Sequence, residues 1–224
     1  MARTQTLLQL RTSVQMRGQY ENSVDITTSM LTEFVNEAIA ECWDLLIQRW
    51  ADYYVTRANL ALVAGTDAYA LPTDFYKLRK VELVDASAPS GYRRLRPADL
   101  AVSHAFGNVV AWHYRYRIEA GNLVIMPTPT VAQTLRLFYI QYAARLVSDS
   151  DTFDGINGYE ELVVQIALKR CKMREELPTN DIDQEIARLT MRIRDAADGR
   201  DATEPMTYSP YGPDDGSDWA EWDW

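Results

Sequence analysis

The stretch Thr66–Asp85 constrains the fold most, because the spacing of apolar residues changes there. Tyr69 and Leu71 alternate with small residues, which is typical of a half-buried strand. Pro72 then interrupts the pattern, since proline has no N–H to donate to a sheet. Apolar residues that resume after this turn indicate a second strand: Leu78, Val81, Leu83 and Val84. A β-rich region therefore follows a helical first part.

Residues on both sides of this region follow a helical period. From Ser29, a plausible N-cap, a broad apolar stripe runs at three- and four-residue steps: Leu31, Phe34, Val35, Ala38, Ile39, Cys42, Trp43, Leu46 and Trp50. A shorter amphipathic helix is predicted over 4–16, ahead of Gly18. Two further helices are predicted over 159–176 and from about 180 to Gly199.

The β-rich region is predicted to contain several short strands. A strand is expected near 53–62, and a hairpin is expected around Glu119–Asn122. Residues 134–142 alternate with large apolar groups on both faces, which favours a central strand. Pro97–Ser103 is predicted to form one or two helical turns, because proline suits the first position of a helix. Residues 148–157 are predicted to form a polar loop.

These patterns predict an α+β fold: a helical bundle with an inserted antiparallel β-domain and an extended C-terminal arm. The expected boundaries place the bundle at 1–52 and 155–199, the β-domain at 53–154 and the arm at 200–224. A chain of 224 residues suits one body with such an insertion rather than two full domains.

Charge is distributed unevenly along the chain. The formal net charge is −9. Residues 200–224 contain seven acidic residues and one basic residue, Arg200, so this segment carries −6 and the rest of the chain carries −3. The sequence therefore gives no indication of the excess of Lys and Arg that is usual in proteins that hold nucleic acid tightly.

Candidate catalytic and metal-binding residues are few. The only two histidines, His104 and His113, have no second ligand at metal spacing. Three acids resemble a calcium loop in composition but lack its spacing and its closing glutamate: Asp149, Asp151 and Asp154. Asp67 and Asp74 lie in predicted turns, where aspartate is favoured for backbone reasons. We find no phosphate-binding loop or nucleophile motif, so we expect no catalytic residue, no cofactor and no metal.

The two cysteines, Cys42 and Cys171, lie in predicted helices without a CxxC or His-rich spacing. We interpret them as buried free thiols in a reducing compartment, and a disulfide between the two helices is the alternative. No signal peptide and no apolar run long enough to span a bilayer are recognised. The protein is therefore expected in the cytosol, either soluble or assembled into something larger.

The C-terminal arm combines acids with aromatic residues: Tyr208, Tyr211, Trp219, Trp222 and Trp224. Its composition predicts disorder when the arm is alone. An unimportant flexible end is one reading. Tryptophan is enriched among interface anchors, however, so we favour an arm that becomes ordered on a partner, with the tryptophans in pockets and the carboxylates facing basic residues.

Five segments, in this order, resemble the head-to-tail adaptor (connector) proteins of tailed bacteriophages. They are CWDLLIQRW, DAYALPTDFYKLRKVEL, YRYRIEAGNLVIMPTP, TLRLFYIQYA and DGINGYEELVVQIALKR. The match covers roughly residues 23–173, and the strongest elements are the Tyr-Leu-Pro-x-Asp-Phe motif, the Gly-Asn-Leu hairpin and the Asp-Gly loop before a helix. The acidic arm lies outside the matched part.

The resemblance implies a structural virion protein without enzyme activity, assembled in the host cytoplasm and located at the head–tail interface. Such proteins form a ring, commonly of twelve copies, under the portal. They contact tail nozzle or fibre proteins and let DNA pass through the channel without specific binding, with no membrane involved. The net acidity agrees with a channel that repels phosphate, provided that the acids face inward.

A second interpretation is a β-domain binding module for tail-fibre attachment or carbohydrate. It depends on strand tyrosines being exposed as an aromatic platform: Tyr114, Tyr116, Tyr139 and Tyr142. Alternating tyrosines on strands more often pack within the sheet. A glycan screen separates the two interpretations.

Overall fold

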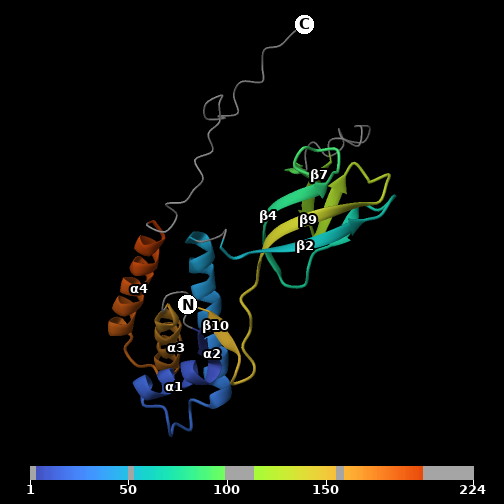
Figure 1. Ribbon diagram of the computed structural model, residues 1–224. Helices are drawn as coiled ribbons and strands as arrows, with labels where there is room; N and C mark the ends of the chain where they lie inside the picture. The colour runs from blue at the N-terminus through green and yellow to red at the C-terminus, as the bar shows by residue number, and fades with distance from the viewer. Residues whose placement is uncertain (1–3, 50–52, 99–113, 155–158, 199–224) are drawn as a thin grey trace.

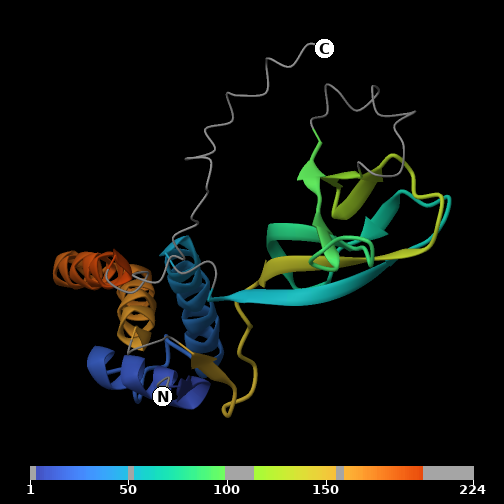
Figure 2. The ribbon, with the colours of Figure 1, turned by 45° about the horizontal axis from the view of Figure 1, so that its top comes forward.

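The computed structural model describes residues 4–49, 53–98, 114–154 and 159–198. In these ranges the protein is a mixed α+β structure with four helices and several antiparallel sheets. The helices lie together on one side and the longer strands on the other, in two views of the molecule (Figures 1 and 2). Within the same ranges, no helix combines the length and apolar composition that crossing a membrane requires.

The helices predicted from apolar spacing are present, with shifted ends. They are α1 (Leu7–Gly18), α2 (Thr28–Arg49), α3 (Glu160–Arg174) and α4 (Asn180–Asp198). α3 is the central helix, because α1, α2 and α4 all contact it. It buries side chains around most of its circumference, as expected for an enclosed helix: Leu162, Val163, Val164, Ile166, Ala167, Leu168 and Cys171.

α1 begins later than predicted because Thr6 and Gln9 form a capping box. The Gln9 N–H donates to the Thr6 hydroxyl at 3.2 Å, and the Thr6 N–H donates to the Gln9 side chain at 3.0 Å. The helix ends at Gly18, where the ring of Tyr20 packs so closely that an added Cβ would lie 2.0 Å from it. A side chain at position 18 would therefore force the Tyr20 ring to move.

Residues before α1 form a strand that the sequence did not predict. β1 (Thr4–Thr6) pairs antiparallel with β10 (Thr152–Asp154), with Gln5 opposite Phe153. The prediction of a helix from residue 4 and of a loop over 148–157 is therefore wrong at these strands. Three-residue strands are too short to show a period of two, and their partner lies at the other end of the chain.

The N-terminus of α2 also differs from the prediction. The Thr27 hydroxyl accepts a hydrogen bond from the Met30 N–H at 3.4 Å, so Thr27 acts as the cap and Ser29 lies in the first turn. Threonine and serine are both good N-caps, and three of them follow one another here. Local sequence therefore cannot decide which hydroxyl takes the role.

The strands of the central region form two four-stranded sheets. In the first the order is β2 (Val55–Leu62), β9 (Gln133–Gln141), β4 (Phe75–Val84) and β5 (Tyr92–Arg94). In the second the order is β3 (Ala68–Ala70), β8 (Asn122–Met126), β7 (Arg115–Glu119) and β6 (Arg96–Pro97). β9 pairs with β2 and with β4, which confirms the prediction that it is a central strand.

Two hydrophobic cores form, one among the helices and one shared by the two sheets. The helical core includes Leu10, Leu46 and Leu162. The sheet core takes Leu135 and Leu137 from the first sheet and Leu123 and Ile125 from the second. Side chains at alternate positions of β8 and β9 therefore hold the sheets together.

The predicted hairpin around Glu119–Asn122 is confirmed. β7 and β8 pair antiparallel up to Glu119 and Asn122, with Ala120 and Gly121 as the turn. Both turn residues have positive φ, 45° and 79°, as a turn matching the twist of a hairpin requires. Glycine meets this requirement without steric cost.

The prediction of a helix beginning at Pro97 is wrong. Arg96 and Pro97 form β6, which pairs parallel with β7. The Ala98 N–H donates to the Tyr116 carbonyl at 2.8 Å, so pairing continues beside the proline. β6 lies at the edge of its sheet, where the missing N–H of proline is tolerated. Residues 99–103 of this predicted helix lie outside the described ranges.

Candidate interaction surfaces

Most residues predicted to bind a partner cannot be placed in the structure. Residues 199–224, which include all five aromatic residues of the arm, lie outside the described ranges. The same is true of His104 and His113. The described residues therefore test the remaining candidates only.

The four strand tyrosines do not form one exposed platform. Tyr114 and Tyr139 are buried, with 6% and 3% of their surface exposed. Tyr116 is half-buried, and Tyr142 is 58% exposed. The expectation that all four are exposed is wrong for the first two, because their side chains point into the core of the two sheets.

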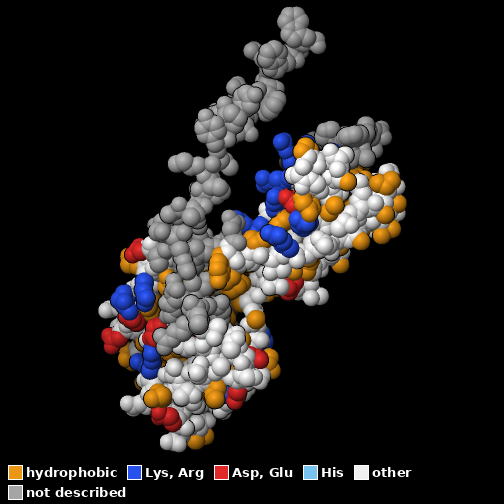
Figure 3. All heavy atoms as spheres, in the orientation of Figure 1, with side chains coloured by type: hydrophobic (Ala, Val, Ile, Leu, Met, Phe, Trp, Pro, Cys, Tyr) orange, Lys and Arg blue, Asp and Glu red, His pale blue; other side chains and the backbone are white. Residues whose placement is uncertain are grey.

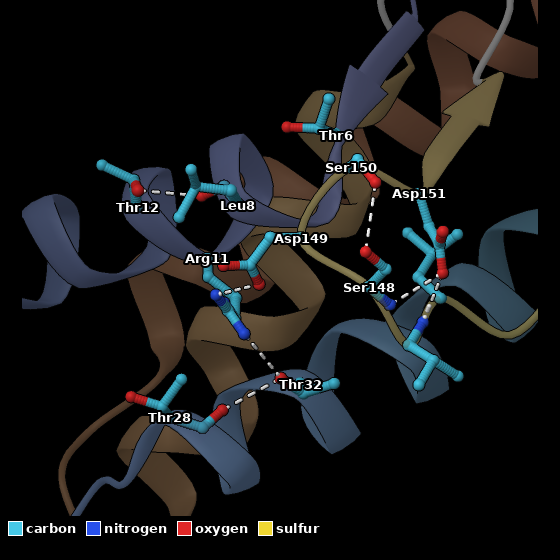
Figure 4. Close-up of polar contacts among 12 residues, drawn as sticks. Thr6, Leu8, Arg11, Thr12, Thr28, Thr32, Ser148, Asp149, Ser150 and Asp151 are labelled. Carbon is cyan, nitrogen blue, oxygen red and sulfur yellow. Dashed lines mark hydrogen bonds and ion pairs between the residues drawn. The ribbon is translucent and has the colours of Figure 1, made fainter.

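Two of the aspartates that resemble a calcium loop, Asp149 and Asp151, make structural contacts (Figure 4). Asp149 accepts a hydrogen bond from Arg11 at 2.6 Å, and Arg11 also reaches Thr32 of α2 at 3.2 Å. Asp151 accepts two backbone N–H groups, from residues 147 and 148, at 2.8 Å each. These bonds hold the loop against α1 and α2. No group of three potential metal ligands occurs among the described residues.

The turn aspartates are likewise structural. Asp74 accepts hydrogen bonds from the Tyr139 hydroxyl, at 2.9 Å, and from the Gln141 side chain. The Asp67 carbonyl accepts the Ile125 N–H at 2.8 Å. The Asp74 side chain therefore joins its turn to β9, whereas Asp67 makes its contact through the backbone.

Cys42 and Cys171 are buried free thiols in α2 and α3. Burial, with a smaller effect of the Glu160 charge, raises the pKa of Cys42 to about 12. Burial and the Glu175 charge raise the pKa of Cys171 to about 11. Because the thiolate is the reactive form, both thiols are expected to be unreactive at neutral pH.

We expect an aromatic disulfide reagent at about pH 8 to react with neither thiol in the folded protein and with both after unfolding without reductant. Absorbance of the released thiolate measures both stages. Rapid reaction in the folded state contradicts the burial of these thiols. Failure to react after unfolding indicates the disulfide alternative.

An ion pair joins the end of α1 to the start of α3. Arg17 donates two hydrogen bonds to the Glu161 carboxylate, one of them at 2.8 Å. Burial disfavours the ionised form of Glu161, but hydrogen bonds from Arg17 and Gln165 outweigh burial and the Glu185 charge, so the pKa lies below its ordinary value of 4.5. A lowered pKa in the folded state stabilises the fold above pH 4.5, and this contribution is lost as the pH falls through the folded value.

We therefore expect the urea midpoint of the natural chain to fall more steeply below pH 4.5 than that of the Glu161→Gln variant. Chemical denaturation followed by circular dichroism over a series of pH values measures this difference. Above pH 5 the two curves should run parallel, at about a constant offset. Parallel curves at all pH values contradict a lowered Glu161 pKa.

Aromatic residues connect α2 to the sheets. The Trp43 indole N–H donates to the Gln141 carbonyl of β9 at 3.1 Å, and its ring packs edge-on against Tyr54 with centroids 4.4 Å apart. Nearby, the Tyr76 hydroxyl donates to Asp44 at 2.6 Å. These contacts join α2 to the first sheet.

A basic cleft lies where β5, β6 and β7 meet. We give this name to the surface lined by Lys80, Arg93, Arg94, Leu95, Arg96, Tyr114, Arg115 and Tyr116. Its larger part has a volume of about 430 Å³. Lys and Arg side chains gather on this half of the molecule, whereas acids and bases are mixed over the helices (Figure 3).

The basic cleft was not predicted from the sequence, because the net charge of the whole chain is negative. A local signal was present, because the segments Arg93–Pro97 and Arg115–Arg117 are rich in arginine. Only the parallel pairing of β6 with β7 brings the two segments side by side. A search for local charge in paired strands would have found it.

A second surface lies between α2 and α3. The groove has a volume of about 680 Å³ and is lined by Phe34, Glu41, Ile166, Lys169, Arg170, Met173 and Arg174. Arg170 bridges Glu37 and Glu41 of α2, and Met173 is 60% exposed. This mixture of an apolar floor and paired charges is typical of a surface that contacts protein.

The SU10 adaptor protein family model matches residues 5–212, which span the helices and both sheets. No curated protein matches the chain.

Proposed function

The chain belongs to the SU10 adaptor protein family, a family of phage structural proteins, and we propose that it is a head-to-tail adaptor that forms a ring under the portal. In this role it links the portal to tail components and continues the DNA channel. The observation that carries the proposal is the family match, which spans nearly all the elements of the structure rather than one motif. The predicted resemblance is thereby confirmed for the family.

The helices and the sheets have different roles in the proposed ring. We propose that residues 1–52 and 155–199 act as a helical bundle, with residues 53–154 as an inserted β-domain. The bundle offers the groove between α2 and α3, with the exposed Met173, for packing beside a neighbouring copy. The sheets, joined to α2 by the hydrogen bond of Trp43, present a surface toward tail nozzle or fibre proteins.

The C-terminal arm is the proposed contact with the portal. Its tryptophans act as anchors, Trp219, Trp222 and Trp224, and Tyr208 and Tyr211 add portal or partner contacts. Large aromatic side chains in a segment rich in acids fit a partner surface with apolar pockets rimmed by basic residues. α4, with its strongly amphipathic sequence, leads into this arm.

The proposed ring contains twelve copies. It is located at the head–tail interface of the virion. DNA passes through such a ring without specific binding. An acidic lumen suits this passage, because it repels the phosphate backbone.

Co-sedimentation with the portal ring of the same virus tests the proposal. We expect the full chain to sediment with the portal ring and not with capsid shells assembled without a portal. A chain that binds neither particle, or both equally, contradicts the proposed function.

A further inference from the structure

The basic cleft concentrates positive charge in a chain that is acidic overall. Of the described residues that line it, five are basic and none is acidic: Lys80, Arg93, Arg94, Arg96 and Arg115. Two carboxylates adjoin it, since Asp85 pairs with Arg93 at 2.6 Å and Glu82 pairs with Lys80. Arg94 and Arg96 lie outside these two pairs.

The cleft also offers apolar surface beside its cations. Arg94 and Arg96 are exposed at its rim. Its wall contains the half-buried ring of Tyr116, and its floor contains Leu95, which is 3% exposed. The ring of Tyr116 packs against the core of the sheets, and this burial raises the pKa of Tyr116 although the Arg94 charge opposes the shift. Cations around an apolar floor suit an extended acidic segment.

The same chain carries a segment of complementary charge. Three aspartates lie close together just ahead of the tryptophans of the arm: Asp214, Asp215 and Asp218. Residue 214 follows the end of α4 by 16 residues, a length that reaches roughly 55 Å when extended. The segment can therefore extend well beyond the helix that leads into it.

A ring needs two different surfaces on each copy, because a head-to-tail contact joins one patch to another. The basic cleft and the acidic segment are two such surfaces. Given the ring of the proposed function, we propose that the basic cleft of one copy binds the segment Asp214–Asp218 of the neighbouring copy. This contact leaves Trp219, Trp222 and Trp224 available for the portal.

Nucleic acid is the competing occupant, because phosphates also bind clustered arginines. The arm is favoured because every copy in the proposed ring carries one, so arms are present in the ring at a high effective concentration. The arm also has a net charge of −6, whereas the rest of the chain has a net charge of −3. The acidic charge of the protein is therefore concentrated in the arm.

Charge reversal in the full-length chain tests the inference. The first variant is Arg94→Glu with Arg96→Glu, and the second is Asp214→Lys with Asp215→Lys. We expect each to raise the adaptor concentration that half-saturates the portal ring by at least about tenfold, because like charges then face each other. Mass photometry of portal–adaptor complexes measures this concentration.

Mixing the two variants distinguishes contacts between copies from contacts within one chain. In an equal mixture, each arm finds a cleft of opposite charge on the other variant, so we expect assembly to recover to within about threefold of the natural chain. A control matched to the first variant, Arg57→Glu with Lys77→Glu, makes the same change in net charge at exposed positions of the first sheet and should assemble normally.

Three results overturn the inference. One is normal assembly of both reversed variants. Another is failure of the mixed variants to assemble while a single chain that carries all four substitutions does assemble. That combination places the contact within one copy. The third is loss of binding to a short DNA duplex in the first variant with assembly unchanged, which assigns the cleft to nucleic acid. If the natural chain itself does not join the portal ring, the proposed function fails instead.

Discussion

Replacing Trp219, Trp222 and Trp224 together with alanine is expected to weaken binding to the portal ring at least about a hundredfold. Truncation of a buried tryptophan anchor costs about 2–4 kcal/mol, and the three losses do not simply add. The arm's acids remain in this variant, so electrostatic attraction toward the portal is retained. The loss should therefore appear mainly as faster dissociation, measured by surface-immobilised portal rings and soluble adaptor.

A triple Trp→Phe variant is the matched control for the tryptophan anchors. It keeps aromatic side chains in the pockets, so we expect a loss of only about tenfold. Thermal unfolding of all three proteins, recorded in parallel, shows whether the core is affected. Unchanged portal affinity in the alanine variant contradicts the proposed role of the arm.

Replacing Trp43 with alanine is expected to lower the free energy of unfolding by about 3 kcal/mol. The substitution removes the edge-on packing against Tyr54, at 4.4 Å between centroids, and the hydrogen bond to the Gln141 carbonyl, at 3.1 Å. In a protein of this size the melting temperature should fall by about 6–12 °C. Differential scanning calorimetry measures both quantities.

The Trp43→Phe variant separates the two contributions. It keeps most of the ring contact and loses the indole N–H, so its expected cost is about 1 kcal/mol. Small-angle X-ray scattering of both variants reports whether the sheets still hold their orientation to the helices. If Trp43→Ala changes neither stability nor scattering, this contact does not fix the sheets.

Apolar spacing predicted the larger elements of the fold. The stripe from Leu31 to Leu46 predicted α2, and the large side chains on both faces of 134–142 predicted the central position of β9. These elements are long enough for a period to show. The hairpin was predicted because Gly121 supplies the positive φ that its turn needs.

The remaining structure depends on contacts that local sequence does not contain. β1 and β10 pair across the chain, and each has only three residues. Pro97 suits the start of a helix as well as an edge strand, and only its pairing beside Tyr116 decides between them. The basic cleft was missed for the same reason, because Arg94 and Arg115 come together only through this pairing.

One mass measurement tests the central claim most directly. The full chain and a chain ending at residue 199 are each measured alone and with the portal ring. The adaptor account predicts a defined set of copies, twelve in the proposed ring, joined to the portal by the full chain. The shortened chain should remain unbound. A small oligomer that forms equally with or without the portal and the arm would contradict this account.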